Sequence, residues 1–368
     1  MRILIAPDKF KHSLGARAVA DNIAAGLREV ILDAAIEIVP IADGGEGTAE
    51  VIHQARGGEW ATCDSHDALG RAITAQYVTL PARPTAVMEM SEASGLWRIA
   101  PHERDPVRAN TCGVGEILQD AAGRGAHEII IGLGGSATND GGFGLARVLG
   151  FRFLNKRGAE LTGSVSDLLE LDCISPPRDL ALPRIIGAAD VRNPLLGERG
   201  ATRTFGPQKG ATPDQVTLLE EALALLADVV TRDQGCDFRD SAGAGAAGGL
   251  GFGLMTFCGA AIRPGFDLVA EMVELESAIQ RADVVITGEG RLDQSTLEGK
   301  APAGVARLAR EMGKRVYAIV GCMSEETSAV QVFDNVFSLA SPSIARDEAM
   351  SRTAELLRER ARDLGRTL

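Results

Sequence analysis

The chain has 368 residues, enough for two domains that each have a hydrophobic core. Its 38 lysines and arginines stand against 50 aspartates and glutamates, and a net charge of −12 argues against nucleic acid and anionic membrane surfaces as partners. Six scattered cysteines without a CxxC pair argue against a disulfide framework, and no apolar run could cross a membrane, so we expect a soluble, cytoplasmic protein.

The first sixty residues alternate between strand-like and helix-like segments. A buried strand over residues 3–6 precedes a helix that Ser13 can cap. A second strand over residues 36–42 ends in Asp43-Gly44-Gly45-Glu46-Gly47-Thr48, and a helix over residues 49–55 follows. This order is typical of a β-α-β-α unit in a parallel sheet.

The middle of the chain, from about Trp60 to Gly265, is less regular and rich in glycine. The pattern predicts strands over 87–90, 128–132 and 185–188, helices over 113–122, 213–231 and 247–261, and glycine-rich turns at 132–144 and 243–253.

The last hundred residues return to the regular alternation. Strands are predicted over 283–287, 316–320 and 336–339, with helices around 302–311 and from 347 onward. We therefore expect an α/β protein of two domains. Residues 1–60 and 266–368 would form a doubly wound parallel-sheet, Rossmann-like domain, and residues 61–265 an inserted α/β domain with glycine-rich phosphate loops.

Charged side chains follow three of the predicted strands where each strand ends. They are Asp8, Lys9 and Lys11 after the first strand, Asp43 and Glu46 after the second, and Glu289, Arg291 and Asp293 after the strand over 283–287. Each loop alone is compatible with a simple turn, because Asp-Gly and Gly-Gly pairs favour turns. Three such loops at one sheet edge favour a ligand site, since open α/β sheets bind ligands at the carboxyl ends of their strands.

Residues 134–142 read Gly-Gly-Ser-Ala-Thr-Asn-Asp-Gly-Gly and follow the predicted strand over 128–132. Glycines let the backbone approach an anion closely, and Ser136, Thr138 and Asn139 add polar groups without negative charge. The segment predicts a polyphosphate-binding loop. A tight strand-to-helix turn is the alternative, but it would not need two glycine pairs.

Two segments fit the spacing of a dinucleotide-binding loop. Residues 243–249 contain GxGxxG without a preceding strand, which makes the match weak. Residues 132–137 fit GxGxxA after a strand, but the next predicted strand, over 151–154, ends without a ribose-binding acid. An NAD(P)-dependent oxidoreductase is therefore a minor alternative. The sequence has no Walker motif, no GxSxG elbow and no histidines at metal-ligand spacing.

Two further turns carry candidate groups. Asp190 follows the strand over 185–188 and either forms part of a site or initiates the turn at Asn193-Pro194. Residues 205–210, Phe-Gly-Pro-Gln-Lys-Gly, form a second turn that we expect to be exposed. For it, a plain Pro-Gly turn and an anion contact by the lysine are equal alternatives.

Together these segments resemble the bacterial glycerate kinase family, which phosphorylates D-glycerate at its 2-hydroxyl. The matching segments are Ala6-Pro7-Asp8-x-Phe10-Lys11-x-Ser13-Leu14, residues 42–48, 134–142, Asp190-Val191-x-Asn193-Pro194-Leu195, 205–210, 243–249 and Ile286-Thr287-Gly288-Glu289-Gly290-Arg291. Each match is modest alone, but all of them in this order are highly specific.

The resemblance implies ATP and Mg²⁺ as co-substrates and an active site in the cleft between two α/β domains. It also implies a role in the breakdown of glycerate, glyoxylate or sugar diacids. The expected ATP contacts are Gly134, Gly135, Ser136, Thr138 and Asn139, with Gly245 and Gly248. The residues indicate no oligomeric state, and phosphorylation at the 2-position rather than the 3-position follows from the resemblance alone.

Charged residues are the candidates for metal binding, proton transfer and substrate binding. Asp190 and Asp43 are the candidates to hold Mg²⁺, and either is also a candidate general base. Lys11 and Arg291 are expected to hold the glycerate carboxylate or stabilise the transferring phosphoryl group, because Arg suits bidentate contact with a carboxylate. Asp8, Ser13 and Asp293 complete the expected substrate contacts.

Three positions depart from the family pattern. Lys9 replaces a small residue, Ala189 replaces a cysteine, and Gln294 stands one position early, whereas Asp293 and Lys300 stay in register. A further alternative is a regulator that binds a metabolite without turnover. The charged residues at several strand ends argue against it, since a binding protein needs fewer of them.

Overall fold

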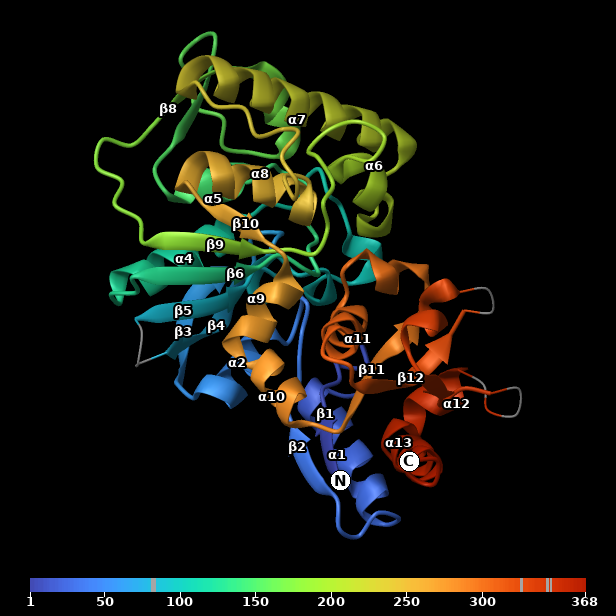
Figure 1. The fold of residues 1–368 in the computed structure, drawn as a ribbon. Coiled ribbons are helices and arrows are strands. Elements are labelled where there is room, and N and C mark those ends of the chain that lie inside the picture. Colours follow the sequence, from blue (N-terminus) through green and yellow to red (C-terminus); the bar gives the residue numbers. More distant parts are fainter. Residues whose placement is uncertain (81–83, 325–326, 342–343, 345) are drawn as a thin grey trace. The chain divides into compact units, whose positions relative to one another are not determined.

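The computed structural model describes residues 1–80, 84–324, 327–341, 344 and 346–368 (Figure 1). The chain divides into two compact units. The terminal unit comprises Met1–Asp43, Glu50–Arg56 and Pro264–Leu368, and the central unit comprises Gly44–Ala49 and Gly57–Arg263. Residues 44–49 thus cluster with the central unit, whereas the sequence grouped them with the terminal segments. The α/β fold class is confirmed.

The terminal unit is built on a five-stranded parallel sheet in the order β13-β12-β11-β1-β2. Its strands are β1 (Arg2–Ile5), β2 (Ala35–Ile38), β11 (Val284–Leu292), β12 (Arg315–Met323) and β13 (Asn335–Ser338). The central strands are continuous apolar runs, as expected for a parallel sheet covered on both faces. This is the doubly wound sheet that the sequence predicted from both ends of the chain.

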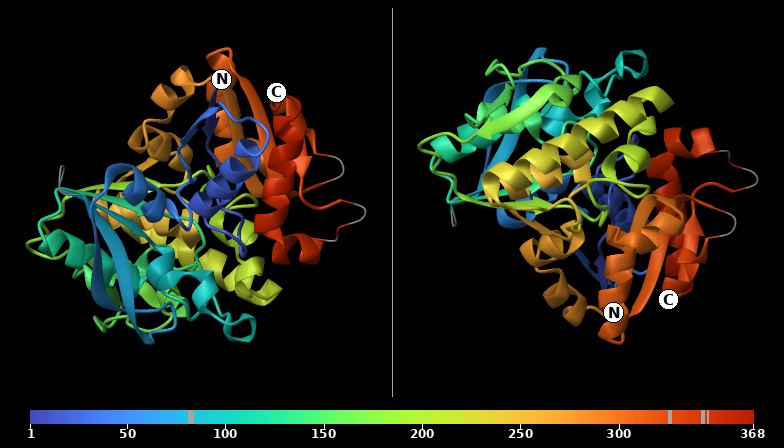
Figure 2. Two further views of the ribbon diagram at one scale, coloured as in Figure 1. Left: turned by 90° about the horizontal axis from the view of Figure 1, so that it is seen from below. Right: turned by 90° about the horizontal axis from the view of Figure 1, so that it is seen from above.

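The helices of this unit are α1 (Ala16–Arg28), α2 (Thr48–Arg56), α9 (Gly265–Met272), α10 (Leu275–Arg281), α11 (Ala301–Glu311), α12 (Arg346–Ser351) and α13 (Thr353–Gly365), with 3₁₀ turns η5 (Gln294–Glu298) and η6 (Ser328–Val332). Helices α1, α10, α11, α12 and α13 contact the strands of the sheet. Figure 2 shows α13, near the C-terminus, lying beside α1 near the N-terminus. A Cβ at Gly26 would lie 2.3 Å from the carbonyl oxygen of Arg358, so this glycine permits the two helices to approach closely.

The central unit contains a six-stranded mixed sheet in the order β10-β9-β6-β5-β4-β3. The strands are β3 (Glu59–His66), β4 (Ala72–Leu80), β5 (Thr85–Glu89), β6 (Glu128–Gly132), β9 (Arg184–Ala188) and β10 (Ala261–Arg263). Strands β5, β6, β9 and β10 are parallel, while β3 and β4 add an antiparallel edge. Strand β3 alternates buried and exposed residues, so one of its faces packs on the core.

The central unit also contains an antiparallel pair of strands, β7 (Arg152–Asn155) and β8 (Leu171–Ser175). The helices are α3 (Ser91–Ser94), α4 (Cys112–Gly123), α5 (Phe143–Val148), α6 (Ala201–Phe205), α7 (Pro213–Gln234) and α8 (Ala246–Cys258), with 3₁₀ turns η1 (Leu96–Arg98), η2 (Pro101–Glu103), η3 (Val165–Glu170) and η4 (Pro207–Lys209). The rings of Phe143 and Phe153 pack edge to face with their centroids 4.8 Å apart, and this contact joins α5 to β7.

None of the helices in the part of the chain that the structure describes is both long and apolar enough to span a membrane.

Candidate active site

The glycine-rich loop of residues 134–142 follows β6 at the carboxyl edge of the central sheet, where β6 lies between β5 and β9. The loop glycines Gly135, Gly141 and Gly142 have φ angles of 76°, 63° and 80°. Glycine adopts these left-handed conformations without the steric cost that other residues meet. Helix α5 begins directly after the loop at Phe143. The loop therefore joins a strand to a helix at the edge where α/β sheets bind ligands.

The segment after Asp43 packs directly on this loop. The N–H of Gly134 donates to the carbonyl oxygen of Gly44 at 3.2 Å. A Cβ at Gly132 would lie 2.6 Å from that same oxygen, and a Cβ at Gly134 would lie 2.5 Å from the Cα of Gly45. Any larger residue at these positions would collide with backbone atoms, so the glycines allow two distant motifs to touch. Asp43 immediately precedes the residue that supports the loop.

Glu89, the last residue of β5, is a buried carboxylate that sequence reasoning missed. Its side chain is 6% exposed, and Oε1 accepts the N–H of Ala49 at 2.9 Å. The contact fixes the start of α2 against the end of the neighbouring strand. A signal was present in the sequence, because Glu89 is an acidic residue near the end of a predicted buried strand.

Residues 243–249 support the loop through a second set of glycines. Three successive residues of α8, 247–249, have φ angles of 53°, 68° and 88°, which interrupts the helix near its start. A Cβ at Gly248 would lie 1.9 Å from the carbonyl oxygen of Thr138. The small residues of this segment therefore pack closely against the backbone of the loop, and the contact of Gly245 and Gly248 with the nucleotide stays a prediction.

Asp140 fixes the loop to the helices behind it. The carboxylate accepts hydrogen bonds from the N–H and hydroxyl of Thr111 at 2.9 and 2.8 Å, and from the N–H groups of Gly142 and Gly144 at 3.1 and 3.0 Å. Burial raises the pKa of Asp140, and these four hydrogen bonds oppose that rise. The residue joins the loop to the start of α4 and of α5, a structural role that the sequence motif did not reveal.

Lys209 is buried, although Pro207, Gln208 and Gly210 of the same turn are exposed as predicted. Its side chain is 2% exposed. The ammonium group donates to the hydroxyl oxygen of Ser136 at 2.8 Å and to the carbonyl oxygen of Thr138 at 2.7 Å. Burial lowers the pKa of Lys209 to about 7, and the charge of Asp140 opposes this shift. The lysine is thus part of the interior of the loop.

Two buried oxygens of the loop have no hydrogen-bond partner among the described residues: Thr138 Oγ1 and Asn139 Oδ1. The amide nitrogen of Asn139 donates to the hydroxyl of Thr202 at 2.9 Å, so this side chain is held in place. Buried polar atoms are normally satisfied, and the exceptions often mark a place where a ligand or ion belongs. The loop thus contains two buried polar oxygens that form no hydrogen bond with the described residues of the protein.

Asp190 follows the strand next to the loop. It lies two residues beyond the end of β9. The N–H of Leu133 donates to the carbonyl oxygen of Ala188 at 3.0 Å, so the chain leading to Asp190 runs beside the start of the loop. Three residues further on, the carbonyl oxygen of Asn193 accepts the N–H of Gly245 at 2.9 Å. The structure therefore brings Asp190 and the loop to one edge of the central sheet.

The dinucleotide-binding interpretation of residues 132–137 is wrong. In such a site, the strand after the glycine turn and helix lies parallel to the first strand in the same sheet. Here the next strand is β7, which pairs antiparallel with β8 in a separate two-stranded sheet. A longer loop also separates these residues from the start of α5 at Phe143.

A carboxylate cluster stands at the carboxyl edge of the terminal sheet. Asp8 follows β1, and its N–H donates to the carbonyl oxygen of Gly288 in β11 at 2.9 Å. Burial, together with repulsion by Asp43 and Glu289, raises the pKa of Asp8 to about 8, although Lys9 opposes the shift. A carboxyl group whose pKa is raised by neighbouring negative charges in this way favours the arrival of a proton or a cation.

Glu289 is the most buried member of this cluster, with 8% of its side chain exposed. Its Oε1 accepts the hydroxyl of Thr296 at 2.7 Å, and its Oε2 lies 3.9 Å from the ammonium of Lys300. Burial raises the pKa of Glu289 to about 7, while the Thr296 hydroxyl and the Lys300 charge lower it. Asp43 contributes to the repulsion here as well.

Asp293 caps η5 and is held as an anion. Its Oδ1 accepts the N–H of Ser295 at 3.0 Å, and it lies 3.4 Å from Arg291 Nε and 3.8 Å from Lys300 Nζ. Burial tends to raise the pKa of Asp293, but the Ser295 hydrogen bonds and the two cations outweigh it and hold the pKa below its usual value. The Arg291 side chain stays half exposed at this edge.

Lys11, Ser13 and Gln294, the remaining residues singled out in the sequence, have different surroundings. Lys11 lies in a turn that packs on β11, since a Cβ at Gly290 would lie 3.3 Å from its backbone nitrogen. Ser13 donates its hydroxyl to Thr353 in α13 at 2.7 Å, which turns it away from the carboxylate cluster. The shifted Gln294 accepts the hydroxyl of Ser328 at 3.0 Å and joins η5 to η6.

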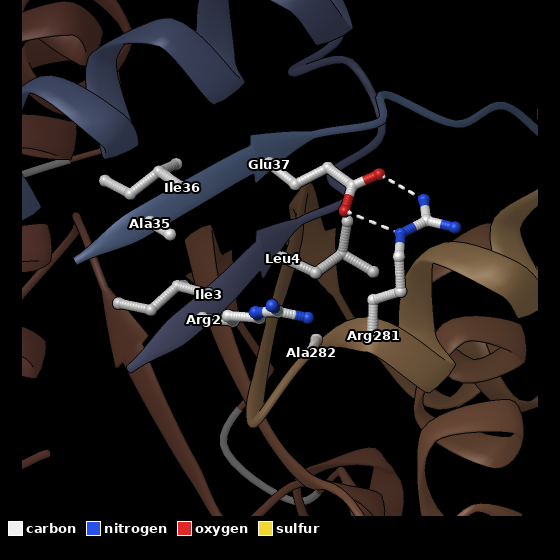
Figure 3. Close-up of a pocket in the computed structure, with 8 residues that line it drawn as sticks. All are labelled: Arg2, Ile3, Leu4, Ala35, Ile36, Glu37, Arg281 and Ala282. Carbon is white, nitrogen blue, oxygen red and sulfur yellow. Dashed lines mark hydrogen bonds and ion pairs between the residues drawn. The ribbon is translucent and has the colours of Figure 1, made fainter.

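A cavity of about 340 Å³ lies at the other end of the terminal sheet (Figure 3). It is bordered by the first residues of β1 and β2, and the ion pair between Arg281 and Glu37 closes one side. The carboxylates of the cluster lie toward the carboxyl ends of the strands, with Glu289 still inside β11, so this cavity has no part in the candidate site.

Comparison with known proteins agrees with this arrangement. Residues 3–368 match the Glycerate kinase family. The chain is 40% identical to the glycerate kinase of Bacillus subtilis strain 168 over 100% of its own length and 98% of that protein. It is 39% identical to the glycerate 2-kinase of Escherichia coli K12, again over 100% and 98% of the two chains.

A solved structure from Salmonella typhimurium LT2, named as glycerate kinase 2, superposes with a TM-score of 0.85 at 40% identity, covering 100% of this chain and 98% of that one. The match therefore covers both units of this chain. The chain belongs to the glycerate kinase family.

Proposed function

We propose that the protein transfers the γ-phosphoryl group of ATP to the 2-hydroxyl of D-glycerate and releases 2-phosphoglycerate and ADP. The observation that carries the proposal is the convergence of separate family motifs on one loop. Residues 44–45, 193 and 243–249 all support the loop at 134–142 or its immediate neighbours through backbone contacts. In that loop the buried hydroxyl of Thr138 has no partner among the described residues and can donate to an anion, whereas the unpartnered amide oxygen of Asn139 can only accept a hydrogen bond.

ATP would bind through its phosphates to this loop. The backbone N–H of Gly135 and the side chains of Ser136, Thr138 and Asn139 are the proposed contacts, because they offer polar groups close to the backbone without negative charge. Gly134, whose N–H already donates to Gly44, would instead let the loop backbone approach the phosphates closely. Gly245 and Gly248 would contribute by holding the loop in shape. Phosphoryl transfer depends on such positioning more than on covalent chemistry by the protein.

Mg²⁺ fits the chemistry of the residues present. Among the described residues no three His, Cys, Asp or Glu side chains form a metal cage. Mg²⁺ needs none, because it usually takes one or two protein carboxylates together with water and substrate phosphates. Asp43 and Asp190 would supply these carboxylates, and the repulsion that Asp43 exerts on Asp8 is one that a cation would relieve. When bound, the ion would neutralise charge on the phosphates.

Glycerate would bind at the carboxylate edge of the terminal sheet. Lys11 and Arg291 are the cations proposed to hold its carboxylate, and Asp293 would orient Arg291 from 3.4 Å. Asp8 is our candidate to take the proton from the attacking hydroxyl, since a carboxylate with a raised pKa accepts a proton more readily near neutral pH. Ser13 is left out, because its hydroxyl already bonds to Thr353.

We place this reaction in the cytoplasm and in the breakdown of glycerate, glyoxylate or sugar diacids. All six cysteines are free thiols, which supports a reducing compartment. The glycerate 2-kinase of Escherichia coli among the relatives supports the 2-position.

A coupled assay tests the activity and its regiochemistry together. Purified protein is incubated with D-glycerate, Mg²⁺ and ATP, and the product is coupled to enolase without phosphoglycerate mutase. Enolase consumes 2-phosphoglycerate but not the 3-phosphate, so a signal is expected from enolase alone. A signal that appears only after addition of the mutase would assign the 3-position. Binding of glycerate without ADP release would favour the metabolite-binding regulator.

A further inference from the structure

The loop at residues 134–142 packs around the ammonium group of a lysine from a different part of the chain, Lys209. Lys209 stands at the end of η4, 73 positions after Ser136, and only 2% of it is exposed. Its ammonium group donates to Ser136 Oγ at 2.8 Å and to the carbonyl oxygen of Thr138 at 2.7 Å. A buried ammonium is costly unless it is paired, so a lysine at this place calls for a function.

The direction of one of these hydrogen bonds has a chemical consequence. A lysine ammonium has three donors and no acceptor, so Ser136 Oγ must be the acceptor in this pair. The hydroxyl hydrogen of Ser136 then points away from Lys209, and no acceptor for it is found among the described residues. Beside it, Thr138 Oγ1 is buried and also lacks a partner within the described part of the chain. Both hydroxyls are therefore available to donate.

We propose that Lys209 is a positioning residue of the anion loop: by occupying the acceptor side of Ser136, it directs the serine hydroxyl as a donor toward a phosphate oxygen of the nucleotide. This inference rests on the proposed function of the loop as the phosphate site. Lys209 also holds the backbone of the loop through the carbonyl oxygen of Thr138, at the place where Gly248 packs.

Charge supports the same role. Asp140 is the charged group that acts on Lys209 within the described structure, and it is itself engaged by four donors. Burial lowers the pKa of Lys209 to about 7, so the lysine loses its proton as the pH rises through that value. A neutral amine can accept the Ser136 hydroxyl hydrogen, which reverses the bond and withdraws the donor from the phosphate. Phosphate affinity should therefore fall above about pH 7.

A double-mutant cycle tests the proposal by isothermal titration with ADP. Lys209→Met removes the donor at nearly constant volume, Ser136→Ala removes the hydroxyl, and exposed Lys156→Met serves as the matched control. Each single variant at the loop should weaken ADP binding about 10-fold, the value of one hydrogen bond to a charged group. The double variant should also lose about 10-fold, and not about 100-fold, because both changes interrupt one chain of bonds.

The pH dependence provides a readout that a merely structural lysine would not affect. Wild-type affinity for ADP should decline between about pH 6 and pH 8.5 more steeply than that of Lys209→Met, and Ser136→Ala should show the shallower decline too. Lys209→Gln, which keeps an N–H donor, should recover part of the affinity if Lys209→Met folds poorly.

The outcomes separate the inference from the function on which it rests. Additive losses in the double variant, or an unchanged affinity in Lys209→Met, would overturn the role of Lys209 while the loop remains the phosphate site. If Ser136→Ala binds ADP as tightly as wild type, the loop is not the phosphate site and the proposed function of the loop fails as well.

Discussion

Gly248→Ala tests whether close backbone packing holds the anion loop. Gly248 has a φ of 68°, and the new Cβ would lie 1.9 Å from the carbonyl oxygen of Thr138. The left-handed backbone costs an alanine about 1–2 kcal/mol. A collision with backbone atoms that must then shift costs a further ~1–3 kcal/mol. We therefore expect Gly248→Ala to lower the free energy of unfolding by about 2–5 kcal/mol and to disturb mainly the loop at 134–142.

Gly259→Ala is the matched control at the other end of the same helix. Its φ is 63°, and nothing lies within 4 Å of the position that a Cβ would take. Both substitutions restrict the unfolded chain equally, so that contribution cancels in the comparison. Calorimetry should show that the melting temperature falls by roughly 2–4 °C for each kcal/mol of lost stability, and that it falls further in Gly248→Ala than in Gly259→Ala. Only Gly248→Ala should also bind ADP more weakly. Equal melting temperatures and equal ADP affinities in the two variants would refute the packing argument.

Three further predictions concern the charged and hydroxyl groups. Asp190→Asn should lower kcat more than about 100-fold at an unchanged melting temperature, and near-normal turnover would remove Asp190 from the chemistry. Because the pKa of Asp8 is raised to about 8, kcat/KM should rise with pH through that value, and Asp8→Asn should abolish this limb of the profile. The folded protein then holds that proton more tightly than the unfolded chain, so urea titrations should show stability falling from about pH 4 to pH 8, less steeply in Asp8→Asn. Ser13→Ala should leave the KM for D-glycerate unchanged, because the hydroxyl bonds to Thr353, and a clear rise in KM would return Ser13 to the substrate site.

The sequence predicted the terminal sheet well, because the signal there is local. A strand was expected over residues 3–6 and β1 spans Arg2–Ile5, and the strand expected over 283–287 begins β11. Buried parallel strands are short apolar runs, and a polar residue marks where each leaves the sheet. The rule placed Asp8 correctly after β1, whereas Glu289 and Arg291, predicted to follow a strand over 283–287, lie inside β11, which continues to Leu292.

The antiparallel edge of the central sheet could not be predicted in the same way. In β3, the residues that face the core include Ala61, Cys63 and Ser65, which are small and only weakly apolar. The outward positions carry Trp60 and Thr62, so the alternation of hydrophobicity is nearly lost. The strand is identified by its pairing with β4 and not by its composition.

Buried charges were missed because their partners lie far away in the sequence. Lys209 looked like a surface turn, since a lysine after Pro-Gln carries no local sign of burial. Its partner Ser136 is 73 residues earlier, and the partner of Glu89 is the backbone of Ala49, 40 residues earlier. Whether a charge can be buried depends on such partners, so only the folded chain reveals that these two side chains are buried.

The glycine content shows why the family motifs are informative only in combination. Glycine makes up 43 of the 368 residues, and several of the motif glycines contact backbone atoms of another motif: Gly134 meets Gly45, Gly248 meets Thr138, and Gly245 meets Pro194. Each of these glycines is required by a partner elsewhere in the chain, so no single motif specifies the loop. Substitutions at the supporting positions should therefore weaken nucleotide binding without touching the nucleotide, as the pair Gly248→Ala and Gly259→Ala is designed to show.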